Sequence, residues 1–203
     1  MFKSLLILSS LCVLTSCGVS YKTLELEKLP FQNTAQLKEN VTVSYLYDIQ
    51  TLSRNKRYGK KEHRAGYAAV GIKIKNESNQ PIQITDNNFK VIANGKERPL
   101  ISPDTYTAKV KQHPTIHLLH FLWGPWYNKD FGTYHEEHLQ YLPVGAAVGV
   151  INLVIAARGN IKHTKTLKTN TLIGRTVEPG NTLNGIILMA SPSYEPLTFE
   201  LRE

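Results

Sequence analysis

Short runs in which apolar and polar residues alternate limit what this chain can fold into more than any other feature of its sequence. The clearest run covers residues 41–50 and reads V-T-V-S-Y-L-Y-D-I-Q. Successive side chains of a strand point to opposite faces, so this spacing puts five apolar residues on one face: Val41, Val43, Tyr45, Tyr47 and Ile49. Strands that are apolar on one face and polar on the other are typical of antiparallel sheets.

Turn signals separate this run from others of the same kind. Residues 67–75 place Val70, Ile72 and Ile74 on one face, and the polar cluster 76–81 that follows predicts a turn. The pair Asn94-Gly95 is typical of a two-residue hairpin. Shorter strands are expected over 82–84, 89–92, 98–101, 172–177, 182–189 and 196–201. We therefore expect a mainly β chain, α+β overall, with about seven short strands.

Two of these segments resemble parts of known domains. Residues 71–82, G-I-K-I-K-N-E-S-N-Q-P-I, resemble a central strand and its turn in the immunoglobulin-like domains found in many bacterial lipoproteins. Residues 177–188, V-E-P-G-N-T-L-N-G-I-I-L, resemble the penultimate hairpin of such domains. The resemblance implies an immunoglobulin-like antiparallel β-sandwich over residues 41–203. Its motifs are structural, so it implies a fold and a location but no activity.

The N-terminal residues predict export and lipidation. Residues 1–16 contain one positive charge followed by an apolar run that is too short to span a bilayer, which needs about 20 apolar residues. Such a segment is typical of a removable signal peptide. The sequence L-T-S-C at 14–17 resembles the lipobox of bacterial lipoproteins, which implies that Cys17 becomes the first mature residue, acylated on its sulfur and its amine. The other cysteine, Cys12, lies in the leader, so no intramolecular disulfide is expected.

A lipid anchor would hold the protein in the cell envelope. Residues 17–40 are mostly polar and are expected to form a lipidated tether. Gly18 stands where an Asp would resemble the inner-membrane retention signal of Gram-negative bacteria, so the outer membrane, facing the periplasm, is favoured. The formal net charge of +8 suits anionic lipids or polysaccharides. Nucleic acid is not an expected partner of an envelope protein.

Residues 103–170 interrupt the β pattern and are expected to form a helical, aromatic-rich insertion. Seven of the 21 residues 121–141 are aromatic. Amphipathic rings favour membrane–water interfaces, so the residues expected to act at an interface are Trp123, Trp126, Tyr127, Phe131 and Tyr134.

The apolar stretch at 143–158 predicts a helix within this insertion. Helical spacing places Gly145, Gly149, Asn152 and Ala156 on one face, with a bulkier face beside it formed by Val144, Val148, Ile151 and Ile155. Its reach of about 22 Å is short of the roughly 30 Å hydrocarbon core, which disfavours a membrane span. Three alternatives stay open: the helix packs on the sheet, lies at a membrane interface, or binds a partner.

A dense basic segment lies at 54–64. It carries six fixed positive charges and one negative charge, so we expect an exposed loop between two strands. One interpretation is a solvated loop with no partner. The other is a patch that orients the domain on anionic headgroups through Arg54, Lys56, Arg57, Lys60, Lys61 and Arg64.

The sequence favours neither catalysis nor a cofactor. It contains no nucleophile elbow, no Cys–His pair in the mature chain and no phosphate-binding loop. The spacing H-E-E-H at 135–138 is one residue short of the zinc-protease motif. A metal site is therefore only an alternative, and its ligands would be His117, His120, His135 and His138.

These observations favour a non-catalytic, membrane-anchored envelope lipoprotein that acts as a structural or interaction module. Its expected partners are the membrane, through the anchor, and an envelope protein or a glycan. One alternative is a carbohydrate- or peptidoglycan-binding module in which the tryptophans stack on sugar rings. The other is a metal-binding protein that uses the histidines.

Overall fold

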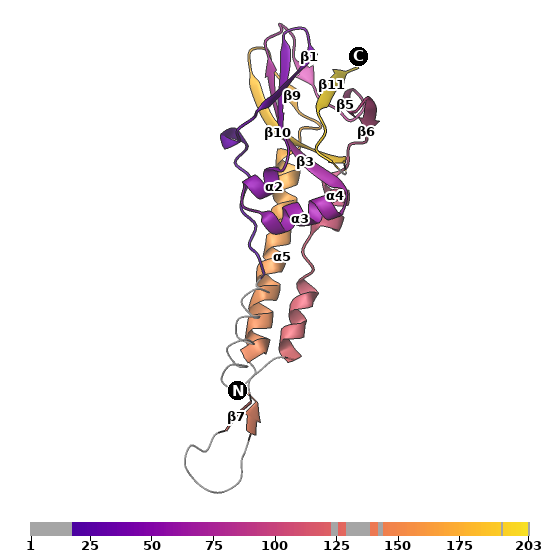
Figure 1. Cartoon of the computed structure of the whole chain (residues 1–203). Coiled ribbons are helices and arrows are strands. Elements are labelled where there is room, and N and C mark those ends of the chain that lie inside the picture. Colours follow the sequence, from indigo (N-terminus) through magenta and orange to yellow (C-terminus); the bar gives the residue numbers. More distant parts are fainter. Residues whose placement is uncertain (1–17, 123–125, 129–138, 142–143, 192, 203) are drawn as a thin grey trace. The chain divides into compact units, whose positions relative to one another are not determined.

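The computed structural model describes residues 18–122, 126–128, 139–141, 144–191 and 193–202 (Figure 1). The chain divides into two compact units. The first unit consists of Met1–Ser20 with Gln112–Asn160, and the second of Tyr21–Lys111 with Ile161–Glu203. We call them the helical unit and the β unit.

Antiparallel sheets form the framework of the β unit. A four-stranded sheet has the order β1-β2-β3-β10, formed by Asn33–Lys38, Val41–Leu46, Tyr67–Asn76 and Thr182–Ala190. A three-stranded sheet has the order β11-β5-β6, formed by Leu197–Leu201, Phe89–Ala93 and Lys96–Arg98. A third pair joins β4 (Ile82–Gln83) to β9 (Thr176–Val177).

Both faces of the four-stranded sheet are buried. Along β10, Ile187 and Met189 belong to a core that includes side chains of the three-stranded sheet. The alternating residues Ile186 and Leu188 belong to a second core, formed with helices. Because β3 is also covered on both faces, it carries a nearly continuous apolar run instead of strict alternation.

Short helices supply the other side of this second core. They are η1 (Leu26–Lys28), α2 (Ile49–Leu52), α3 (Lys56–Arg64) and α4 (Pro103–Val110). Figure 1 shows α2, α3 and α4 grouped near β3, and α2 and α3 both contact that strand. Ser102 caps α4, since its hydroxyl accepts from the Thr105 N–H at 3.2 Å, and a proline suits the first turn that follows.

The helical unit contains short elements and most of one long helix. They are η2 (Pro114–Leu122), the pair β7 (Trp126–Asn128) and β8 (Leu139–Tyr141), and α5 (Val144–Asn170), whose last ten residues belong to the β unit. None of the helices that the structure describes is both long and apolar enough to cross a membrane.

The structure confirms the α+β class and the antiparallel pairing. Strand β3 matches the run predicted at 67–75, and Val70, Ile72 and Ile74 are all buried. The hairpin predicted at Asn94-Gly95 joins β5 to β6, with positive φ angles of 51° and 71° at the two residues. This is the left-handed backbone that such a turn requires.

Several local expectations were wrong or incomplete. The strand expected over 41–50 ends at Leu46, and Ile49 begins the helix α2. The basic segment 54–64 is not an exposed loop, because Lys56–Arg64 forms α3 and buries Tyr58, Gly59 and Glu62. The long helix continues past residue 158 to Asn170. The stretch 17–40, expected to be a tether, includes strand β1, which pairs with β2, so the ordered fold begins before Val41.

Candidate functional site

Helix α5 has two faces of opposite character within the helical unit. The small-residue stripe predicted from the sequence is buried: Gly145, Gly149, Asn152 and Ala156. On the opposite side of the helix three apolar side chains stay exposed, namely Val150 (49%), Ile151 (58%) and Val154 (38%). We call these three residues the apolar helix face. The structure describes no protein group that covers them.

The start of the predicted mature chain lies against the buried face of α5. The Gly18 N–H donates to Oδ1 of Asn152 at 3.0 Å. A Cβ at residue 18 would overlap with the main-chain oxygen of Asn152 and would lie 3.1 Å from its carbonyl carbon. Only glycine therefore allows this approach. The Nδ2 of Asn152, which is 4% exposed, has no acceptor among the described residues.

Further hydrogen bonds hold the same N-terminal residues. The Val19 N–H donates to Oε1 of Gln112 at 3.3 Å, and Nε2 of Gln112 donates to the Val19 carbonyl at 2.7 Å. The backbone of Gln112 is bound by Asn160 of α5 through two bonds, of 2.8 and 2.9 Å. Residues 18 and 19 are thus docked on α5 and on Gln112, two residues before η2.

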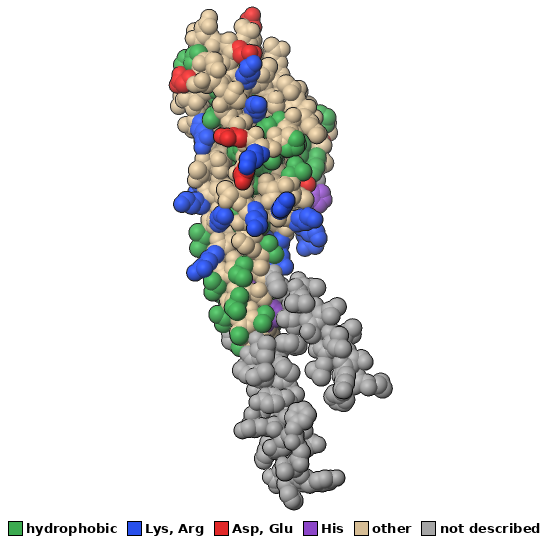
Figure 2. All heavy atoms as spheres, turned by 90° about the vertical axis from the view of Figure 1, so that its left-hand side faces the viewer, with side chains coloured by type: hydrophobic (Ala, Val, Ile, Leu, Met, Phe, Trp, Pro, Cys, Tyr) green, Lys and Arg blue, Asp and Glu red, His purple; other side chains and the backbone are tan. Residues whose placement is uncertain are grey.

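A second set of exposed apolar side chains lies on η2. Ile116, Leu118 and Leu119 are 59%, 47% and 64% exposed. Figure 2 shows hydrophobic side chains exposed along the narrow part of the molecule and also over the β unit. An apolar set of this size needs an explanation, whereas single exposed apolar residues do not.

The apolar helix face gives way to basic residues further along α5. Residues 144–157 carry no charge, and the first charged residue is Arg158, which is exposed. On an α-helix Val150, Val154 and Arg158 lie one above the other at four-residue spacing. Exposed Lys162 and Lys165 follow on the next two turns. One face of a single helix therefore changes from wholly apolar to largely cationic, with Ile161, 69% exposed, among the basic residues.

A cluster of polar and aromatic side chains, all at most 1% exposed, lies in the helix-side core of the β unit. We call it the polar–aromatic cluster: Tyr21, Gln50, Tyr58, Glu62, Tyr106 and His163. The carboxylate of Glu62 accepts a short bond from the Tyr106 hydroxyl and a 3.0 Å bond from the Ala69 N–H. The cluster joins α2, α3, α4, α5 and the segment before η1.

The His163 ring lies at the centre of this cluster. Its centroid is 4.4 Å from that of Tyr58 and 4.9 Å from that of Tyr21. The Tyr21 hydroxyl donates to Oε1 of Gln50, and Nε2 of Gln50 lies 3.3 Å from Nε2 of His163. Because an amide nitrogen only donates, the imidazole Nε2 accepts and the proton lies on Nδ1. That Nδ1 has no acceptor among the described residues.

Burial shifts the carboxyl and imidazole groups of the cluster towards their neutral forms. Desolvation raises the pKa of Glu62 to about 7, against the lowering effect of its bonds from Tyr106 and Ala69. Desolvation lowers the pKa of His163 to about 3. Shifts of this kind often mark active sites. Here both groups are closed off from solvent, so a substrate has no route to them in this structure.

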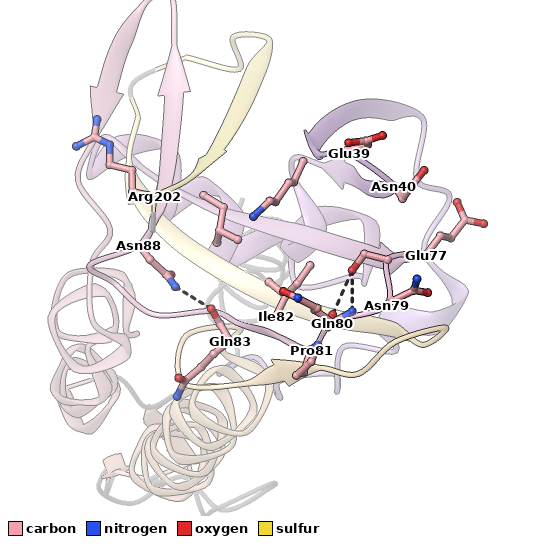
Figure 3. Close-up of a pocket in the computed structure, with 13 residues that line it drawn as sticks. Glu39, Asn40, Glu77, Asn79, Gln80, Pro81, Ile82, Gln83, Asn88 and Arg202 are labelled. Carbon is pink, nitrogen blue, oxygen red and sulfur yellow. Dashed lines mark hydrogen bonds between the residues drawn. The ribbon is translucent and has the colours of Figure 1, made fainter.

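A polar cavity of about 640 Å³ opens elsewhere in the β unit, between the β1–β2 turn, the turn after β3 and the end of β11 (Figure 3). Some of its polar groups bond to one another. Ser78 donates to the Gln80 carbonyl at 3.1 Å, and Asn88 donates to the Gln83 carbonyl at 2.9 Å. No aromatic side chain lines the cavity, so it offers no stacking platform for a sugar.

The structure brings five of the six predicted basic residues onto one face of α3: Lys56, Arg57, Lys60, Lys61 and Arg64. Arg54 lies just before the helix, in a left-handed turn with φ of 64°. Burial, with Arg57 and Arg64 nearby, lowers the pKa of Lys61. The proposed patch is therefore a helix face.

The other predicted site residues are only partly visible. Cys17, Trp123, Phe131, Tyr134, His135 and His138 lie outside the described residues. Trp126 and Tyr127 belong to β7, but their side chains are not described. The rings of His117 and His120 stack in η2 with centroids 6.0 Å apart, and His117 is buried. Within the described residues no group of three or more His, Cys, Asp or Glu could hold a metal ion.

Two features were missed at the sequence level. The polar–aromatic cluster comes from five separate segments, so no local pattern announces it. The docking of Gly18 was also missed, because Gly18 and Asn152 are 134 positions apart in the sequence.

Comparisons with known protein families, with curated proteins and with solved structures found no match.

Proposed function

We propose that this protein is a non-catalytic lipoprotein of the cell envelope, anchored through acylated Cys17 and facing the periplasm from the outer membrane. Its β unit is an immunoglobulin-like sandwich, and its helical insertion is an interaction module at the membrane surface. The observation that carries the proposal is the docking of Gly18 on Asn152 of α5. It brings the end of the mature chain to the same helix that presents the apolar helix face.

The non-catalytic part of the proposal is supported by where the perturbed titratable groups lie. Glu62 and His163 are buried in the β unit, and their polar atoms face Tyr106, Ala69 and Gln50. The polar cavity shares no residue with them. Their burial and their bonds to core residues support a structural role for both groups.

Lipidation is tested by comparing the two cysteines of the full chain in a Gram-negative host. Wild-type protein should fractionate with membranes, and its N-terminal peptide should begin at residue 17 with the mass of attached acyl chains. The Cys17→Ala variant should stay uncleaved and carry no acyl chains. The matched control, Cys12→Ala, should behave like wild type. Wild-type protein that is soluble and free of acyl chains would contradict the proposal.

A further inference from the structure

We infer that the apolar helix face of α5 enters the acyl-chain region of the leaflet that holds the anchor. The inference rests on the proposed function, and it names lipid as the partner of the helical unit. It is drawn from the position of Gly18, from the exposed side chains of α5 and from the change of character along that helix.

The position of Gly18 determines which turn of α5 lies at the membrane surface. Residue 17 is bonded directly to Gly18, whose backbone contacts Asn152. Acyl chains attached at residue 17 must therefore leave the protein close to the turn of α5 that contains Asn152. Val150, Ile151 and Val154 lie within two residues of Asn152 along the same helix, on its other side. An α-helix is only about 10 Å wide, so lipid held at the anchor is within reach of the exposed side of that turn.

The sequence of side chains along α5 agrees with this depth. Arg158 lies six residues beyond Asn152, which is about 9 Å along the helix axis. Its guanidinium can reach the phosphates of the headgroups while its stem stays apolar. Residues 144–151 precede Asn152 without a charge and rise about 12 Å, which fits within one leaflet of roughly 15 Å. This uncharged segment is thus long enough to enter one leaflet and too short to cross the bilayer.

Contact with lipid would also explain why these large apolar side chains are not covered by other parts of the protein. Val150, Ile151 and Val154 are about half exposed, although the opposite face of the same helix is buried. A second copy of the chain is the competing occupant of this face, because small-residue helices also pair with one another. The basic residues that follow on the same face favour anionic lipid, because a second copy in parallel register would bring its own Arg158 and Lys162 against them.

The test places a single reporter on the lipidated protein. The only mature cysteine is acylated in the proposed form, so Val150→Cys, Ile151→Cys or Val154→Cys provides one free thiol for an environment-sensitive nitrobenzoxadiazole label. The proteins are reconstituted into vesicles of phosphatidylethanolamine and phosphatidylglycerol, with or without nitroxide-labelled lipid. Leu52→Cys is the matched control, because Leu52 is an apolar residue of the β unit that is 52% exposed.

We expect blue-shifted emission and several-fold stronger nitroxide quenching at residues 150, 151 and 154 than at residue 52. The inference would be overturned if the labels on α5 showed the same emission wavelength and the same weak nitroxide quenching as the label at residue 52. Labels that shift to the blue without lipid quenching, together with disulfide-linked dimers of Ile151→Cys, would assign the face to a second copy instead. Mass spectrometry of the same samples reports acylation separately, so loss of the anchor is distinguished from failure of the helix to enter lipid.

Discussion

Replacing Glu62 by Gln is the sharpest test of the polar–aromatic cluster. Gln keeps the shape of the side chain, and its carbonyl can accept from the Ala69 N–H as Oε1 does now at 3.0 Å. Its amide can donate to the Tyr106 hydroxyl, so the variant resembles the protonated form of Glu62. The substitution removes only the ionisable carboxyl group of residue 62.

The size and sign of the effect follow from the raised pKa. The pKa of Glu62 lies at about 7 in the folded protein, against 4.5 for an ordinary Glu. Between these values the folded state binds more protons than the unfolded state, so stability is present below the lower value and is lost as pH rises through the upper one. Each pH unit of difference is worth about 1.4 kcal/mol, which amounts to about 3 kcal/mol in total.

The assay is urea unfolding of wild type and Glu62→Gln across a series of buffers from about pH 4 to about pH 8. Taking the difference between the two proteins cancels the titration of every other group. The stability of wild type relative to the variant should fall by about 3 kcal/mol over this range. Glu178→Gln, at an exposed residue, should show no such trend. A difference between wild type and Glu62→Gln that does not change with pH would refute the reasoning.

Three further predictions concern other contacts. The pKa of His163 is lowered to about 3, so the stability that neutral His163 contributes is present above about pH 6.5 and is lost on acidification. Between about pH 6.5 and about pH 3, wild type should therefore lose up to about 5 kcal/mol more free energy of unfolding than His163→Phe, as measured by urea unfolding. Asn76→Ala removes the bonds to the Gln80 and Val177 carbonyls, of 2.8 and 3.0 Å, and should lower the free energy of unfolding by about 2–4 kcal/mol, whereas exposed Asn79→Ala should not. Gly18→Ala should break the bond to Asn152 and speed hydrogen exchange at the amides of residues 18 and 19, with Ser20→Ala unchanged; normal protection in Gly18→Ala would argue against the close approach.

The strands could be predicted because their signals are local. Alternation at 67–75 and the pair Asn94-Gly95 depend on residues that are neighbours in sequence, and the structure has a strand and a hairpin there. The buried small-residue stripe of α5 was predictable for the same reason, since helical spacing alone places Gly145 and Asn152 on one face.

An exposed loop was expected at 54–64 because the charges of the segment were counted without regard to helical spacing. Its charges occupy one side of α3, while Tyr58, Gly59 and Glu62 turn inwards. The spacing of four between Tyr58 and Glu62 was the missed signal. A buried carboxylate also requires a donor, and Tyr106 lies 44 residues away, so the sequence could not supply the partner.

The residues that lie against α5 were the least predictable part of the site. Gly18 and Asn152 are 134 positions apart, and neither carries a charge or an unusual spacing. The aromatic residues expected to act at an interface fall mostly outside the described residues, so their role stays a prediction.

The contact between Gly18 and α5 has a consequence for the order of export, processing and folding. The bond that a signal peptidase would cut is the peptide bond between Ser16 and Cys17, and such an enzyme needs an extended, accessible backbone there. Once Gly18 is pressed against Asn152, that backbone is no longer free to extend. Asn152 is translated long after the leader, so processing enzymes could act on the exported N-terminus before α5 has folded against it. A chain that folds early would conceal its own maturation site.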